Sequence, residues 1–416
     1  MKSMHRYLPS AAALVVFGLL FGCSKDNPVG TIDTTITDGR IIINNDDGTL
    51  DGEMDYSDTS DVTVDTTTVP TPMLAKRSAT AAIRLTLRAT RNPPKYSGST
   101  LRATHVALNG NYAYVAYNTE GNTYLGGVDV IDISNVKKPK LISSAIFVGT
   151  DVSSVFYNGG KVYLAEATED TGFVYPAVIE EITLKSNKLS TPTRRKGVSS
   201  YVATDLKVSG GKIWITSGSG GAGTGGLTIL DATTLNLITE DLFLDARSVD
   251  IEGGTVTVMQ GTGATLRTYD ASTNGFLASY FVGGANIPES KSILDVVLDR
   301  AFVGAGDEGV RVFSFTSGTV IDSLARVTVG GIPINETVTN AVSISKNYLF
   351  AANGEAGVYV AQADFDMETV PSSDPNLRYI GSLKFNTNQS ANFVASNGSI
   401  LFVATGTGGL KIVEIR

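Results

Sequence analysis

Histidine and cysteine are the scarcest reactive side chains in this sequence of 416 residues, which has two histidines and one cysteine. His5 lies in the N-terminal leader, so His105 is the only histidine left for a Ser-His-Asp triad, and a zinc or copper site with several histidines is excluded. The single cysteine, Cys23, excludes disulfides within the chain and iron–sulfur ligation. An enzyme built on this chain would depend on carboxylates, as glycosidases do, or on a calcium site of carboxylates and amides. We expect no cofactor, no metal and no assignable catalytic residue.

Positive charge is also in deficit, because 33 lysines and arginines stand against 41 aspartates and glutamates, giving a net charge of −8 and an isoelectric point near 5.0. A nucleic-acid partner would require a basic face, so none is expected. The short basic cluster Arg84, Arg88, Arg91 and Lys95 is better explained as the solvated face of a strand.

What the sequence does contain is a unit that recurs seven times. Its marker is a residue, usually aromatic, in the middle of a buried strand, at intervals of 43 to 52 residues: Tyr114, Tyr163, Trp214, Thr257, Phe302, Phe350 and Phe402. A period of about 40 to 50 residues is typical of one four-stranded blade of a β-propeller. The apolar period of 3.6 residues that marks a helical repeat does not occur in these units.

Each unit has the same internal order. An alternating strand ends in a tight turn such as Asn109-Gly110, and the buried second strand follows, for example Phe402-Val403-Ala404. A glycine-rich hairpin leads to the third strand, and a weaker outer strand such as 140–147 completes the unit. We therefore predict an all-β fold, a seven-bladed propeller of four-stranded blades over residues 79–416.

Two features bear on the number of blades. Units two and four match the pattern poorly, over 174–184 and 265–271, so six or eight blades remain open. The last unit stops after its third strand at Arg416, whereas residues 82–88 form a strand with no partner of its own. We predict that this early strand becomes the outer strand of the last blade, which would close the ring and remove its free edges.

Blade one carries a resemblance to a known family. Residues 106–116 (VALNGNYAYVA), then 128–135 (VDVIDISN) with Pro139 soon after, resemble the LVIVD repeat of bacterial and archaeal propeller proteins. The resemblance extends over roughly residues 80–416, is weaker in blades two and four, and implies a propeller fold in a surface-protein context. The family implies no particular activity.

Residues 1–22 indicate a lipoprotein signal peptide. Positively charged residues precede an apolar run over 11–21 that is too short for a comfortable membrane span. Cys23 follows Leu-Phe-Gly, which resembles a bacterial lipobox, in which the thiol is diacylated and becomes the mature N-terminus. The resemblance implies a membrane anchor of stably buried acyl chains. The alternative is an ordinary signal peptide followed by an incidental cysteine.

The segment 23–78 is predicted to be a disordered, acidic, threonine-rich tether. As a flexible coil it would span roughly 40 Å. Its start, Ser24-Lys25-Asp26-Asn27, resembles the short export signal of surface lipoproteins in Bacteroidetes. We expect an outer-membrane lipoprotein at the cell surface, with the periplasmic face as the alternative.

A binding site is expected on the face where the loops entering the inner strands lie, since loops vary while the scaffold stays fixed. The residues near the start of the inner strands are candidate ligand-binding residues around the channel mouth: His105, Asp205, Arg247, Asp295 and Asn392. The alternative for each is a structural hydrogen bond that orients its blade. The loops between second and third strands predict an acidic rim, made of Glu120, Glu166, Glu169, Asp170, Asp307, Glu308 and Glu355.

These features support three functional hypotheses. The first is a monomeric, lipid-anchored binding or scaffolding propeller whose loop face takes an unidentified ligand, a protein or a glycan. The second is a carboxylate-dependent hydrolase of glycans or lactone-like substrates, which requires two acids such as Asp205 and Asp295 to face each other across roughly 5 to 10 Å. The third is a subunit of an envelope assembly that uses the blade sides, where an exposed apolar patch would be expected.

Overall fold

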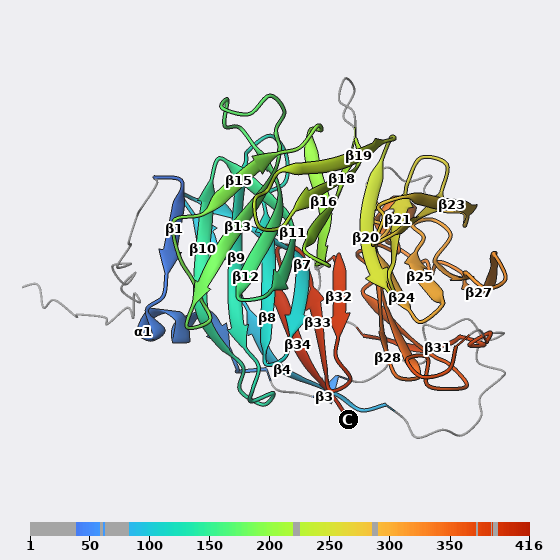
Figure 1. The fold of residues 1–416 in the computed structure, drawn as a ribbon. Coiled ribbons are helices and arrows are strands. Elements are labelled where there is room, and N and C mark those ends of the chain that lie inside the picture. The colour runs from blue at the N-terminus through green and yellow to red at the C-terminus, as the bar shows by residue number, and fades with distance from the viewer. Residues whose placement is uncertain are drawn as a thin grey trace, which may run out of the picture. The chain divides into compact units, whose positions relative to one another are not determined.

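The computed structural model describes residues 39–58, 61–62, 83–218, 225–284, 290–371, 373–383, 385 and 390–416. These residues form seven antiparallel sheets of four or more strands and a separate two-stranded sheet (Figure 1). In the first six of the larger sheets, the four main strands follow each other in chain order. The predicted seven-bladed propeller is confirmed. None of the helices in the described part of the chain is long and apolar enough to span a bilayer.

Blades one to three follow each other along the chain. Blade one consists of β7 (Arg102–Asn109), β8 (Tyr112–Asn118), β9 (Leu125–Asp132) and β10 (Lys140–Val148). Blade two consists of β11 (Thr150–Asn158), β12 (Lys161–Thr168), β13 (Ala177–Lys185) and β15 (Arg194–Gly197), with the short β14 (Lys188–Leu189) also paired to β13. Blade three consists of β16 (Val202–Ser209), β17 (Lys212–Gly218), β18 (Gly226–Asp231) and β19 (Leu237–Leu242).

Blades four to six repeat this order. Blade four consists of β20 (Ala246–Glu252), β21 (Thr255–Gln260), β22 (Thr265–Asp270) and β23 (Phe276–Phe281). Blade five consists of β24 (Leu294–Val297), β25 (Arg300–Gly304), β26 (Val310–Ser314) and β27 (Thr319–Leu324), and the short η2 (Ile334–Glu336) follows it. Blade six consists of β28 (Ala341–Ser345), β29 (Tyr348–Ala352), β30 (Val358–Gln362) and β31 (Arg378–Leu383).

Blade seven takes strands from both ends of the chain. It consists of β32 (Phe393–Ser396), β33 (Ile400–Ala404), β34 (Leu410–Ile415) and β4 (Leu85–Arg91). The ladder between β34 and β4 runs from Leu410 opposite Arg91 to Ile415 opposite Leu85, so the predicted closure by an early strand is confirmed. A small hairpin, β5 (Lys95–Tyr96) with β6 (Ser99–Thr100), then leads into blade one.

The repeat markers explain where the core lies. All seven are on the second strand of their blades, and none exposes more than 2% of its surface. Blade two departs from the pattern at Glu181, which is buried and paired with Arg194 (Nη2 to Oε2, 2.6 Å) and Lys161 (Nζ to Oε1, 3.1 Å). The polar residue is therefore tolerated because two cations neutralise it.

One expectation about the closing strand is wrong. Arg91 does not lie on a solvated face, because its side chain is buried and its Nε donates to Oδ2 of Asp129 in blade one at 2.7 Å. Burial opposes its charge, but Asp129 raises the pKa of Arg91 above its ordinary value. This ion pair joins the last blade to the first.

The disordered tether predicted for residues 23–78 is also wrong over 39–58 and 61–62. β1 (Ile41–Asn44) pairs with the outer edge of β10, so blade one has a fifth strand. After α1 (Asp47–Leu50) and η1 (Asp51–Glu53), β2 (Met54–Asp55) and β3 (Asp61–Val62) pair with the outer edge of β4. The cause is apolar burial, since Ile41 and Ile43 are buried against blade one. Cys23 and the leader lie outside the described residues.

Candidate functional site

Two adjoining pockets open at the end of the ring where the inner strands begin. The first, here called the rim pocket, has a volume of about 340 Å³ and is lined by Arg102, Thr104, Asn118, Thr119, Glu120, Lys291, Asn335, Glu336, Val338, Asn340, Gly354, Ser390 and Asn392. The second, the channel pocket, has a volume of about 300 Å³ and is lined by His105, Asn118, Ser153, Val202, Thr204, Gly218, Asp245, Arg247, Ser290, Lys291 and Ile293. Asn118 and Lys291 line both pockets, so the two share a wall.

The strand order explains why these side chains meet. Arg102 begins the inner strand of blade one and is paired with Asn118, the last residue of its neighbour β8. Asn340 and Asn392 directly precede the inner strands of blades six and seven. Since all inner strands run in the same direction, residues at their starts collect around one end of the channel.

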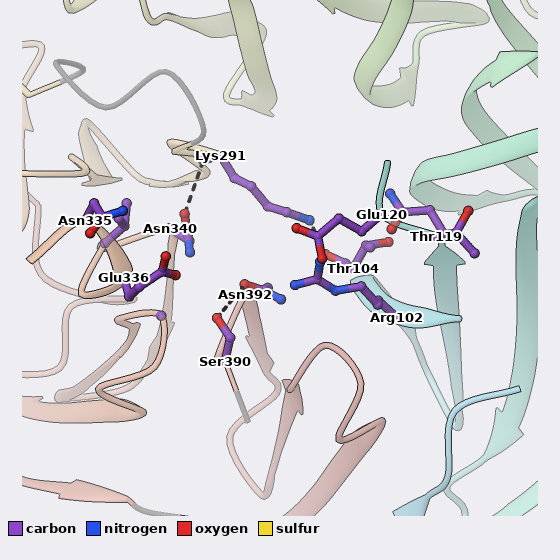
Figure 2. Close-up of a pocket in the computed structure, with 13 residues that line it drawn as sticks. Arg102, Thr104, Thr119, Glu120, Lys291, Asn335, Glu336, Asn340, Ser390 and Asn392 are labelled. Atoms are coloured by element: carbon purple, nitrogen blue, oxygen red, sulfur yellow. Dashed lines mark hydrogen bonds and ion pairs between the residues drawn. The ribbon is translucent and has the colours of Figure 1, made fainter. Parts of the chain in front are cut away.

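Lys291 occupies the wall between the pockets. Its Nζ donates to the backbone oxygen of Thr104 at 2.8 Å, and Figure 2 shows the side chain extending toward Arg102, Glu120 and Thr104. Burial and the charge of Arg102 lower the pKa of Lys291 to about 8, while Asp205 acts in the opposite direction. No carboxylate of the described residues lies within ion-pair distance of its ammonium group.

The arginines of the two pockets differ from Lys291 in being paired. Arg102 forms an ion pair with Glu120 through Nη1. Arg247 pairs with Asp245 (Nη2 to Oδ2, 2.8 Å) and also donates to the backbone oxygen of Ser290 at 3.0 Å. Lys291 is therefore the cation of the shared wall that has no counter-ion among the described residues.

His105 lines the channel pocket as a neutral imidazole. It is buried and packs on Phe393 with ring centroids 4.2 Å apart, and its Nε2 lies 3.8 Å from Oδ1 of Asp205. Burial, together with the charges of Lys207 and Lys291, holds the pKa of His105 well below its usual range. At neutral pH this histidine can accept a hydrogen bond and carries no charge.

Asp205 and Asp295 belong to a belt of acids deeper in the channel. Oδ2 of Asp205 accepts from the backbone nitrogen of Val249 in blade four at 3.1 Å. Asp250 repeats the bond one blade on, to Val296 at 2.8 Å, and Asp295 repeats it again. Oδ2 of Asp295 accepts from the backbone nitrogen of Ile344 in blade six at 3.0 Å. Each acid connects its inner strand to that of the next blade. Asp205 and Asp295 therefore make the structural hydrogen bonds that were the alternative to ligand binding.

The five predicted residues are thus divided between three places. His105 and Arg247 line the channel pocket, Asn392 lines the rim pocket, and the two aspartates lie in the belt without lining either pocket. Sequence reasoning missed Lys291, Lys207 and Asp250. The signal for Lys207 was present, because inner-strand residues two apart point to the same side, as Asp205 and Lys207 do.

Lys207 balances the acids of the belt. Its Nζ lies 3.4 Å from Oδ1 of Asp250. Burial acts to lower the pKa of Lys207, but Asp250, Asp205 and Asp295 together raise it above its ordinary value. The belt therefore carries one firmly charged lysine between three aspartates.

Of the seven acids expected on the rim, four are paired or buried, whereas Glu169 and Glu355 are exposed. Glu120 pairs with Arg102, and Glu308 pairs with Arg311. Asp170 pairs with Arg195 (Nη1 to Oδ2, 2.8 Å). Glu166 is not on the rim at all, since it lies within β12, fully buried.

Glu166 forms part of a buried charge cluster with Glu180, Arg40 and Arg195. Nη2 of Arg40, just before β1, lies 2.7 Å from Oε1 of Glu180, and Nε of Arg195 lies 3.7 Å from Oε2. Burial and the charge of Glu180 raise the pKa of Glu166 well above its usual range. The raised pKa favours the neutral form of Glu166, and the N-terminal segment supplies a counter-ion for Glu180.

Comparison with known proteins supports the repeat and the fold. Residues 102–145 match the LVIVD repeat family. The match runs from β7 into β10 and so covers blade one. No curated protein matches the chain.

Three solved structures are similar to this chain at low sequence identity. The WD40 repeats of RRP9 are similar with a TM-score of 0.57 and 10% identity, over 80% of this chain and 100% of that chain. BamB from Moraxella catarrhalis has a TM-score of 0.47 and 12% identity, over 79% and 91% of the two chains. The computationally designed Ika8 protein has a TM-score of 0.43 and 12% identity, over 76% and 98%. The similarity to RRP9 supports the propeller fold alone.

Proposed function

We propose that this protein is a lipid-anchored propeller of the cell envelope that binds or scaffolds a ligand or partner protein on the face bearing the rim and channel pockets. The observation that carries the proposal is the pair of adjoining pockets at the channel mouth, lined by amides, hydroxyls and charged groups. Polar groups that converge on a concave surface are typical of a binding site.

The anchor and the site are connected by the N-terminal strand. Ile41 pairs with Phe147, and Phe147 pairs with Gly126, at the end of blade one where Asn118 lines both pockets. Cys23 and Gly39 are 16 residues apart, which spans at most about 55 Å when fully extended. An acylated Cys23 would hold the pocket-bearing end of blade one within that distance of the outer membrane.

Acylation is tested by Cys23→Ser. The wild-type chain should incorporate labelled palmitate and sediment with membranes, and the serine variant should lose both properties. A serine variant that stays in the membrane fraction would show that the anchor is not this thiol. The site is tested independently of the anchor.

The binding site is tested by a thermal-shift screen of the full-length chain in detergent against glycans, divalent cations and small metabolites. A ligand at a hundredfold excess over its Kd stabilises the fold by about 2.7 kcal/mol. The shift should vanish in Asn392→Ala or Arg247→Ala and persist in Lys140→Ala, which lies on the exposed start of β10. If no compound shifts the melting temperature, the remaining possibility is a macromolecular partner. A chain that also binds no macromolecule through this face would contradict the proposal.

The hydrolase alternative has less support from the channel. Asp205 and Asp295, the pair it needs, each accept a backbone N–H from the next blade, so their oxygens already serve the scaffold. An assay of glycan and lactone hydrolysis with Asp295→Asn as the matched variant distinguishes the alternative. Turnover that is lost in this variant would favour the hydrolase.

A second candidate, a subunit of an envelope assembly, is favoured by the sides of blades three and four. On β23, Phe276, Leu277 and Phe281 are 50%, 56% and 74% exposed. β19 adds Leu237 and Leu242, which are also half exposed. Among the described strands, β1 covers the outer edge of blade one, and β2 with β3 cover the outer edge of blade seven. β23, in contrast, is the uncovered edge strand of blade four and contains no charged residue. Such an apolar edge is typical of a protein contact.

The assembly is tested by the size of the complex in a detergent extract of the envelope. The wild-type chain should sediment faster than a monomer, and Phe281→Lys should sediment as one. Val174→Lys, at a fully exposed position of blade two, is the matched control and should not change the sedimentation. Monomeric sedimentation of the wild type would exclude this candidate.

A further inference from the structure

The rim pocket is lined by the donor groups of Arg102, Lys291, Asn340 and Asn392 together with the carboxylates of Glu120 and Glu336. The side-chain oxygen of Asn340 accepts the backbone N–H of Lys291 at 3.3 Å, and that of Asn392 accepts from Ser390 Oγ at 3.0 Å. A backbone N–H can only donate, so the group of Asn340 that faces Lys291 N must be the amide oxygen, and the NH₂ group must point the other way. Both amides therefore have their NH₂ groups left for the pocket (Figure 2).

Two cations share the same wall. Lys291 has its ammonium bonded to one backbone oxygen, and Arg102 uses Nη1 for its bond to Glu120. The two charges repel each other, since Arg102 is one of the causes of the lowered pKa of Lys291. An anion placed between them would relieve this repulsion and would meet charge-assisted donors.

We infer that the rim pocket binds the carboxylate of a small, hydroxyl-rich ligand, with Lys291 and Arg102 as its cationic donors. This inference rests on the proposed binding function and names its ligand class. The amides of Asn340 and Asn392 complete the donor set. The remaining lining contains amides and hydroxyls together with the carboxylates of Glu120 and Glu336, and Val338 is its one apolar side chain, so the body of the ligand is polar. A sugar acid such as a uronate has this chemistry.

The charge of Lys291 sets the pH range of binding. The charged groups of the neighbouring elements are Arg102 on β7, Glu120 after β8, Asp205 on β16, the paired Asp245 and Arg247 at the start of β20, and Glu336 in η2, while His105 is neutral. Lys291 is protonated below pH 8 and loses its proton above it, whereas the ligand carboxylate stays charged throughout. Affinity is therefore constant at pH 6 to 7 and falls by up to about tenfold per pH unit above pH 8.

The experiment is calorimetric titration of the full-length chain in detergent with galacturonate, galactose and acetate at pH 6.5 to 9.5. Galacturonate and galactose differ in the carboxylate, and acetate is the carboxylate without the sugar. Galacturonate should bind at least about tenfold more tightly than either, as expected for hydrogen bonds to charged groups. Inorganic phosphate serves as a further arm, and tighter binding of phosphate would assign the pocket to phosphoryl ligands and overturn the carboxylate.

Variants separate the charge from the packing. Lys291→Met should weaken galacturonate at least about tenfold. Lys291→Arg keeps the charge at every pH tested, so it should retain binding and lose the decline above pH 8. Glu120→Gln frees Arg102 from its partner and should tighten binding, which keeps the test informative if Lys291→Met fails to fold. Asn392→Asp places a carboxylate in the donor set and should abolish binding.

The outcomes distinguish the inference from the function on which it rests. Equal binding of galactose and galacturonate, or binding that is unaffected by Lys291→Met in a folded protein, overturns the carboxylate inference and leaves the proposed binding function standing. The carboxylate inference and the proposed binding function both fail if galacturonate does not bind and no ligand of the wider screen gives a melting-temperature shift that depends on Asn392 or Arg247.

Discussion

Asp205 joins three blades through one carboxylate. Its Oδ1 accepts from Ser154 Oγ of blade two at 2.7 Å and from its own neighbour Leu206 at 2.8 Å. Its Oδ2 accepts from Val249 in blade four. Burial raises the pKa of Asp205, and Lys207 with these donors opposes that rise. The residue is thus part of the scaffold that positions the channel pocket beside His105.

The first prediction concerns the loss of this carboxylate. Asp205→Ala leaves the hydroxyl of Ser154 and the N–H of Val249 buried without acceptors, at a cost of about 2 to 4 kcal/mol of the free energy of unfolding. Asp205→Asn keeps one acceptor oxygen and should cost less. Urea unfolding at pH 7 measures both. An alanine variant within about 0.5 kcal/mol of wild type would contradict the role of Asp205 as a hub.

The second prediction concerns pH and Asp295. Burial and the nearby Asp250 raise the pKa of Asp295 to about 7, although Ile344 and Lys207 act against them. An unfolded aspartate loses its proton near pH 4, so between about pH 4 and 7 the folded state binds more protons, and the free energy of unfolding falls as the pH rises.

Asp295→Asn should remove this fall and keep the acceptor for Ile344. Between pH 5 and 8 the wild type should lose about 2 kcal/mol relative to the variant, measured as unfolding free energies across the range. Asp270→Asn is the control, because hydrogen bonds from Ser272 and Thr273 lower the pKa of Asp270 to about 2, below that window. If the free energy of unfolding depends on pH in the same way in the wild type and in Asp295→Asn, the raised pKa of Asp295 is wrong.

At the scale of elements, β1 connects the N-terminal segment to blade one. Its residues alternate, with Ile41 and Ile43 buried and Ile42 partly exposed. Arg40, one residue earlier, reaches Glu180 of blade two, so the strand also neutralises a buried carboxylate. Docking of β1 therefore stabilises two blades.

The third prediction uses the alternation of β1. Ile41→Asp buries a charge where an apolar side chain packed, so β1 should undock at a cost of about 3 kcal/mol, and residues 39–58 should become sensitive to protease. Ile42→Asp changes the same residue type on the other side of the strand and should have a small effect. Limited proteolysis and thermal melting compare the two. Equal effects would mean that the strand pairing does not depend on this burial.

The second strands and their turns could be predicted from the sequence because they are local. An aromatic residue between apolar neighbours and a glycine-containing turn are visible within ten residues, as at Asn109-Gly110 and Tyr114. β1 could not be predicted in this way, because its partner β10 is about 100 residues away and its flanks are acidic. Glu166 was misplaced for a related reason, since β12 continues to Thr168 and carries it into the core.

At the scale of the whole molecule, the number of blades and the closure follow from the repeat, while the contents of the channel do not. A propeller period fixes which residues begin the inner strands, and this placed His105, Arg247 and Asn392 at the pockets. Lys291 comes from the loop before β24, outside the strands that the repeat pattern places. Its position depends on bonds to Thr104 in blade one and Asn340 before blade six, which link distant segments.

The fourth prediction tests the closure of the ring. Leu87 of β4 lies opposite Val413 of β34, and both are buried. In the double variant Leu87→Cys with Val413→Cys, a disulfide would link the two ends of the propeller and restrict the unfolded chain over a very long loop, which stabilises by up to about 6 kcal/mol in the loop-entropy model. Comparing oxidised and reduced protein of the same variant cancels the packing cost of the substitutions. The oxidised form should melt several degrees higher. Identical melting temperatures would contradict the stabilisation expected from linking the two strands that close the ring.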